Sequence, residues 1–164
     1  MENTKERLVR YLQDSHAAEV GIEEILKNFI SECNDEQARA AFQEHLDVTK
    51  SQAARLEARL TALGSGSSSG KSFLNSIMGK LSDIMHASHD AYDKTTQDLI
   101  KAYATEHLEI GMYTSLYAYS EAIGDMETAA LAKEIIAEEQ ASADKLFPMI
   151  SITAKAVLNA TATA

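Results

Sequence analysis

The second half of the sequence repeats the first half at a constant offset of 90 residues. Residues 19–22 read EVGI, and residues 109–112 read EIGM. Without insertion or gap, the same offset aligns further apolar and acidic residues: Leu26 with Leu116, Cys33 with Ile123, Asp35 with Asp125, Glu44 with Glu134, Leu46 with Ile136, and Leu56 with Leu146. Two equivalent halves are expected to fold into two similar units that pack about an approximate two-fold axis.

Both halves have the pattern of helical hairpins. Apolar residues recur three and four positions apart, as on one face of an α-helix. The sequence is rich in helix-favouring Ala, Leu, Glu, Lys and Gln and poor in β-branched and aromatic runs. Turns at 33–37 and 123–127 are too short for anything but antiparallel hairpins, so the fold class is all-α, a four-helix bundle. The helices are expected at about 4–31, 37–63, 94–122 and 127–150.

Capping residues mark the ends of the expected helices. Asn3 followed by Glu6 has the pattern of a capping box at the start of the first helix. In the first turn, Asn34 and Gln37 can cap the second helix, and in the second turn Asp125 is expected to cap the fourth.

A polar segment, SGSSSGKS at residues 65–72, separates the two hairpins. It resembles a phosphate-binding loop, but Ser65 stands where that motif requires glycine and no strand precedes it, which argues against nucleotide binding. The amphipathic stretch that follows predicts a short additional crossover helix. We expect one bundle domain over 1–150, with hairpins at about 4–63 and 94–150, a crossover at 64–93, and a weakly patterned C-terminal tail at 151–164.

The repeated acids Glu19 and Glu109 stand within the apolar stripes of their helices. The two-fold repeat predicts that they face each other across the core. A buried, ionised carboxylate without a partner is too costly to persist, so each must meet a cation, share a proton or accept hydrogen bonds. In four-helix bundles such a pair commonly belongs to a dinuclear metal site, which also takes Glu-x-x-His from each of the other two helices.

Only part of that ligand set is present. Glu139 fits, but Ser142 stands where its histidine belongs, and the repeat partners of these two residues on the second helix are Thr49 and Gln52. Residues one helical turn from the expected positions can substitute for the missing ligands. The candidate metal ligands are therefore Glu19, Glu109, Glu139, His45, His16 and Glu106, and iron or manganese is the expected metal.

Two interpretations of these acids remain open. In the first, a weak or incomplete di-metal site supports a metal-dependent oxidase or peroxide-handling activity, without efficient catalysis. In the second, the protein is a non-catalytic structural or protein-interaction module whose acids are paired by Tyr, Ser, His or shared protons. No serine or cysteine nucleophile with a paired base is evident, so no catalytic residue and no organic cofactor are assigned.

Charge and composition argue against other classes of function. The formal net charge is −10 and no basic stripe occurs, which disfavours nucleic acids and anionic membranes as partners. The sequence has no run of about 18 apolar residues that would span a bilayer and no apolar signal core near its N-terminus. Cys33 is the single cysteine, so no intramolecular disulfide can form. We therefore expect a cytoplasmic protein.

Three stretches resemble the YciE/YciF family of ferritin-like bacterial proteins: FQEHLDVTKSQAARLE at 42–57, TEHLEIGMYTSLYAYSEAIGD at 105–125, and EIIAEEQASADKL at 134–146. The corresponding family patterns are E-H-L-E-E-T-x-x-Q-x-x-R-L, V-E-H-Y-E-I-x-x-Y and E-E-K-A-T-D-x-K-L. The resemblance implies a ferritin-like bundle that forms a homodimer and is associated with bacterial stress responses. Thr49 and Gln52 agree with the family pattern, whereas Val48 and Ala143 stand where the family prefers glutamate and aspartate.

Overall fold

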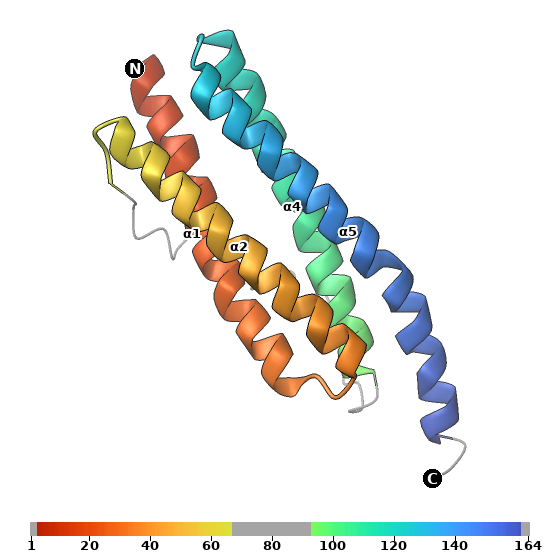
Figure 1. Ribbon diagram of the computed structural model, residues 1–164. Helices are drawn as coiled ribbons and strands as arrows, with labels where there is room; N and C mark the ends of the chain where they lie inside the picture. The colour runs from red at the N-terminus through yellow and green to blue at the C-terminus, as the bar shows by residue number, and fades with distance from the viewer. Residues whose placement is uncertain (1–2, 67–92, 162–164) are drawn as a thin grey trace.

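The computed structural model describes residues 3–66 and 93–161, and these residues form a bundle of four antiparallel helices (Figure 1). The expected crossover helix falls within residues 67–92, which lie outside the described residues. The all-α, four-helix class predicted from the apolar periodicity is confirmed. The helices are α1 (Thr4–Glu32), α2 (Glu36–Ala62), α4 (Lys94–Ala122) and α5 (Met126–Thr161).

The two predicted hairpins are the building blocks of the bundle. α1 packs along α2, and α4 packs along α5, while the hairpins meet through α1 against α4 and α2 against α5. α2 and α4 run in the same direction, so the chain crosses from one end of the bundle to the other between them (Figure 1). Each helix therefore has two antiparallel neighbours.

Side-chain caps mark the starts of three helices, α1, α2 and α5. Asn3 accepts from the Glu6 backbone N–H while the Glu6 carboxylate accepts from the Asn3 N–H, so the predicted capping box is present. Asp125 accepts from the Thr128 N–H at the start of α5, also as predicted. The prediction for α2 was wrong, because Asp35 accepts from the Ala38 N–H. Asp35 is the repeat partner of Asp125, so the repeat itself pointed to this cap.

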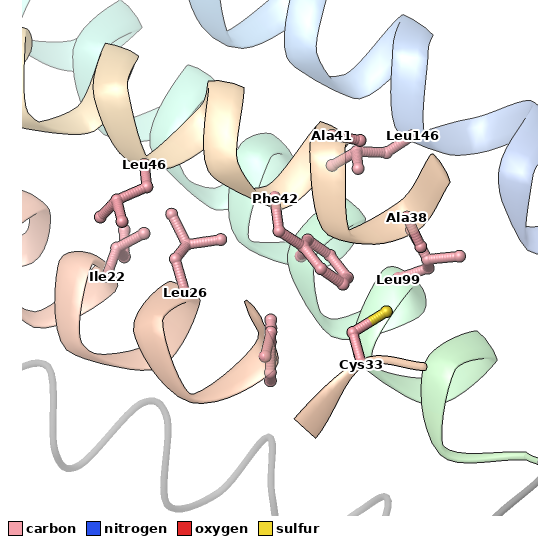
Figure 2. Close-up of a cluster of buried hydrophobic side chains, with 11 residues drawn as sticks. Ile22, Leu26, Cys33, Ala38, Ala41, Phe42, Leu46, Leu99 and Leu146 are labelled. Atoms are coloured by element: carbon pink, nitrogen blue, oxygen red, sulfur yellow. The ribbon is translucent and has the colours of Figure 1, made fainter. Parts of the chain in front are cut away.

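The interior has two hydrophobic clusters with a polar layer between them. On α1, for example, Ser15 and Glu19 are buried between Leu12 in one cluster and Ile22 in the other. The cluster in Figure 2 draws on all four helices and contains Ile22, Leu26, Phe42, Leu46, Leu99 and Leu146. The second cluster contains Leu8, Leu12, Leu56, Leu60, Tyr113, Leu116 and Ile135. These clusters seal the polar layer from both ends of the bundle.

The last helix is longer than its sequence pattern indicates. α5 continues past the expected end near residue 150, although Pro148 removes one backbone donor from the helix. The Thr96 hydroxyl of α4 donates to the Thr153 hydroxyl at 2.9 Å, which ties the extension to the neighbouring helix. Beyond that contact α5 projects from the end of the bundle (Figure 1). Among the described helices, none combines the length and apolar character needed to cross a membrane.

Candidate metal centre

Four buried side chains from three helices converge in the polar layer. His45 comes from α2, Glu106 and Glu109 from successive turns of α4, and Glu139 from α5. Each offers one ligand atom, and these atoms all lie within 4.8 Å of one another. Residues three apart on a helix project from the same face, which is why both α4 acids reach one point. We call His45, Glu106, Glu109 and Glu139 the ligand cluster.

Glu19 of α1 adjoins the ligand cluster. The residue is 0% exposed, and its carboxyl group lies beside that of Glu109. The Tyr113 hydroxyl donates to the Glu19 Oε1 atom. Two buried carboxyl groups approach this closely when they share a proton or bind a common cation. The repeated acids thus meet inside the bundle, as the offset in the sequence predicts.

Gln52 of α2 fixes Glu139 from the other side. Its amide Nε2 donates to Glu139 Oε1 at 2.5 Å and to Glu138 Oε2 at 3.1 Å. Arg55, one turn further along α2, donates to the same Glu138 carboxylate. A chain of contacts therefore runs from the surface of the bundle to the ligand cluster, and it holds Glu139 in one orientation.

His45 is neutral near pH 7. Its pKa is lowered to about 4, mainly because the side chain is buried. The His45 Nε2 atom lies 2.8 Å from Glu106 Oε1, but the two groups do not meet in hydrogen-bond geometry, and neither ring nitrogen has a hydrogen-bond partner. We therefore treat this close approach as a contact rather than an ion pair. The neutral imidazole is the form that ligates metal ions.

Burial raises the pKa values of all four carboxyl groups around this point. The pKa of Glu106 rises to about 7, and that of Glu139 to about 9, where the neighbouring carboxyl group of Glu106 adds to the effect of burial. The pKa values of Glu19 and Glu109 also lie well above their usual range, first because of burial and then because of the neighbouring carboxylates. Without a cation, protons must offset part of the negative charge.

The polar atoms left without partners test whether these residues fit a metal. A buried polar group without a hydrogen bond costs about 1–3 kcal/mol, so native proteins keep few of them. Carboxylate oxygens and imidazole nitrogens are ligands of divalent iron, manganese and zinc, so a cation would satisfy most of these atoms together. The unpartnered atoms in this layer are Nδ1 and Nε2 of His45, both Oε atoms of Glu106, Glu109 Oε1, Glu19 Oε2, Thr49 Oγ1 and Gln52 Oε1.

The six residues predicted from the sequence are therefore distributed unevenly. Glu109, Glu139, His45 and Glu106 form the ligand cluster, and Glu19 contacts Glu109 beside it. His16 is half-buried and does not belong to the group that the described residues form. Its Nδ1 atom is buried without a hydrogen-bond partner. The assignment of metal ligands stays a prediction for all six residues.

Two supporting residues carry roles that the sequence pattern did not assign. Gln52 stood out only as the residue that replaces a histidine, yet it orients Glu139. Tyr113 has the spacing of a core aromatic, yet its hydroxyl group binds Glu19. The sequence signal for this contact was the position of Tyr113 one turn after Glu109, because residues four apart on a helix lie on the same face.

Comparison with known families gives one match over almost the whole chain. The sequence model described as a domain of unknown function, DUF892, matches residues 3–159.

Solved structures share the fold. A protein from Xanthomonas campestris pv. campestris has a TM-score of 0.79 and 24% sequence identity, and the match covers 97% of this chain and 99% of that chain. The Escherichia coli stress protein YciF has a TM-score of 0.79 and 22% identity, with 94% and 99% covered. A two-domain protein from Anabaena variabilis, with DJ-1/ThiJ/PfpI-like and ferritin-like domains, has a TM-score of 0.68 and 22% identity, with 94% and 39% covered.

Proposed function

This chain belongs to the DUF892 family, and we propose that it is a cytoplasmic, stress-associated protein whose bundle core binds a divalent metal, iron or manganese. The single observation that carries the proposal is the ligand cluster: three carboxyl groups and a neutral imidazole converge in a buried layer with most of their polar atoms unpartnered. The stress association rests on the shared fold of the E. coli stress protein.

Charge balance favours one or two cations at this point. Glu19, Glu106, Glu109 and Glu139 carry four negative charges when ionised, and within residues 3–66 and 93–161 no lysine or arginine makes a hydrogen bond or ion pair with them. Two divalent cations would neutralise the four carboxylates, whereas one cation would leave two protons in place. His45 adds a neutral nitrogen ligand.

A bound iron or manganese ion would supply one-electron redox chemistry toward oxygen or peroxide. The residues of this chain would orient the ligands and exclude water. Gln52 would hold Glu139, Tyr113 would hold Glu19, and the two hydrophobic clusters would exclude bulk water from both ends. The sequence has no Glu-x-x-His pair, whereas a complete di-metal set has two, so we propose a weak oxidase or peroxide-handling activity at most.

A second candidate function is a non-catalytic structural or interaction module. The hydrogen bonds from Tyr113 to Glu19 and from Gln52 to Glu139 favour it, as do the contacts between carboxyl groups, because protons and hydrogen bonds offset part of the buried charge without any metal. The two functions differ in one measurable property, which is the affinity for Fe²⁺ or Mn²⁺.

Titration with Mn²⁺, and with Fe²⁺ under anaerobic conditions, tests the metal proposal. We expect stoichiometric binding to protein purified without chelator. Glu109→Ala should weaken the affinity by roughly a hundredfold or more, because even residues that only support metal ligands cost 10–100-fold when removed. Glu57→Ala removes an exposed acid of α2 outside the ligand cluster and is the matched control. Equal affinities for the two variants, or no binding by the unaltered protein, would favour the structural module.

The homodimer implied by the family resemblance stays a proposal. Phe147, Ile152 and Leu158 of α5 are large apolar side chains that are more than half exposed, and exposed apolar surface of this kind is typical of protein interfaces. Light scattering after size exclusion should give twice the mass of one chain. Phe147→Glu should shift the protein toward the mass of a single chain, whereas Glu57→Gln on exposed α2 surface should not.

A further inference from the structure

A groove between α2 and α5 leads toward the ligand cluster. Its inner part is a pocket of about 180 Å³, lined by His45 and Val48 of α2 and by Ala141 and Ser142 of α5, among others. A shallower outer part of about 630 Å³ continues along α2 and shares Val48 with the pocket. Of the ligand cluster, His45 is the member that lines this pocket.

His45 connects the pocket to the metal centre. Its side chain is buried, with 4% of the residue exposed, and both ring nitrogens are without hydrogen-bond partners. The same side chain contributes a ligand atom within 4.8 Å of those of Glu106, Glu109 and Glu139. A cation that entered the pocket would therefore meet an unpartnered imidazole before it met the carboxylates.

The internal repeat explains why the groove is open on this side. The offset of 90 residues pairs Ser142 of α5 with Gln52 of α2. Gln52 is long enough to cross the seam between the helices, where it donates to Glu139 and Glu138. Ser142 has a short side chain that does not cross, and the pocket lies beside it. Ser142, which stands where a histidine ligand was expected, thus leaves the groove open between α2 and α5.

The rim of the groove carries mainly acidic side chains. Glu44, Asp47 and Glu138 line it, against Arg55 and Lys145. Lys145 of α5 is paired with Glu44 of α2, Arg55 with Glu138, and Lys50 with Asp47, so each acid of the rim has a cationic neighbour. The formal net charge of −10 of the whole chain attracts cations and repels anions.

We infer that this groove is the route by which a divalent cation reaches the ligand cluster, and that Ser142 keeps the route open. The inference rests on the proposed metal-binding function and adds the path and the residue that controls it. Val48 and Ser142 would border the passage, His45 would be the first ligand of an entering cation, and the buried carboxylates would be the next.

Stopped-flow measurement of Co²⁺ binding, followed by the absorbance of the protein-bound ion, tests the route. Ser142→Leu fills the pocket with a larger side chain that has no ligand atom, and should slow association roughly tenfold. The equilibrium dissociation constant should change less than twofold, because a barrier on a shared path slows dissociation equally. Val48→Phe closes the same pocket from α2 and should give the same result, which protects the test against a folding defect in one variant.

Two controls separate the route from other effects. Ser142→Ala removes the hydroxyl group but keeps the opening, and Ala137→Leu enlarges an exposed residue of α5 outside the groove. Both should bind at the rate of the unaltered protein. If Ser142→Leu and Val48→Phe bind as fast as these controls, the route is wrong while the metal centre stands. If the unaltered protein binds no Co²⁺ at equilibrium, the metal centre and the route are both wrong.

Discussion

Glu109→Leu is expected to stabilise the metal-free protein by about 1–4 kcal/mol at pH 8, because replacing buried ionisable groups by apolar side chains of similar volume is often favourable. Glu109 is 1% exposed, and burial followed by the charge of Glu19 raises its pKa. Leucine would extend the hydrophobic cluster that contains Tyr113 and Leu116 on the same helix. The same substitution should abolish tight metal binding, so stability and function are expected to change in opposite directions.

Urea denaturation in the presence of a chelator measures this effect. Glu57→Leu places the same side chain on an exposed position of α2 and should change the free energy of unfolding by no more than about 0.5 kcal/mol. If Glu109→Leu were instead clearly less stable than Glu57→Leu, the carboxyl group of Glu109 would be a structural hydrogen-bonding group. That result would favour the module without metal.

The metal-free protein is expected to lose about 2 kcal/mol of stability between pH 7 and pH 9 through Glu139 alone. The pKa of Glu139 is raised to about 9 in the folded protein, whereas in the unfolded chain it lies near 4.5. Between these values the folded state holds a proton that the unfolded state has released, so unfolding becomes easier as the pH rises. Glu106, with a pKa of about 7, contributes in the same direction mainly below pH 7.

His45 has the opposite dependence in a lower range of pH. Its pKa is about 4 in the folded protein and 6.5 in its ordinary state, so the stability that its neutral form contributes is lost as the pH falls through that interval. Above pH 7 this residue no longer titrates. The interval from pH 7 to pH 9 therefore isolates the carboxyl groups.

Free energies of unfolding at pH 7, 8 and 9, with chelator present, would measure this dependence. Glu139→Gln keeps the shape of the side chain but removes the titrating proton, and its stability should vary less over the same interval. Saturating Mn²⁺ should reverse the trend, because metal binding requires deprotonated ligands and therefore strengthens as the pH rises. A metal-free protein whose stability follows that of Glu139→Gln at every pH would disprove the raised pKa of Glu139.

The fold was largely accessible from the sequence because its signals are local or periodic. The apolar stripes of Leu8, Leu12, Ile22 and Leu26 identify a buried helix face without knowledge of its neighbours. The Asn3 capping box also depends only on nearby residues. The cap of α2 was missed because Asn34 and Asp35 are both chemically capable of capping and the local pattern does not choose between them, whereas the repeat and the backbone geometry select Asp35.

The extension of α5 is different in kind, since it depends on a contact between residues far apart in the sequence. Pro148 and a weak apolar pattern favour a helix end near Ile150, because proline lacks the backbone donor that an α-helix uses. The hydrogen bond between Thr96 and Thr153 cannot be predicted from this local pattern. Tertiary packing therefore outweighs the local preference for ending the helix near residue 150.

By itself, the sequence determined that this chain is two similar helical hairpins and that Glu19 and Glu109 are buried together, because a repeat with helical period carries each acid onto the same face as its apolar neighbours. Only the tertiary structure decided which further residues join them. His45, His16 and Glu106 each lie one turn from an expected position, and their spacing along the chain does not distinguish them. The rotation and separation of the packed helices bring His45 and Glu106 to Glu139 and leave His16 outside the ligand cluster. Those distances depend on side chains from four helices at once, which no single stretch of sequence encodes.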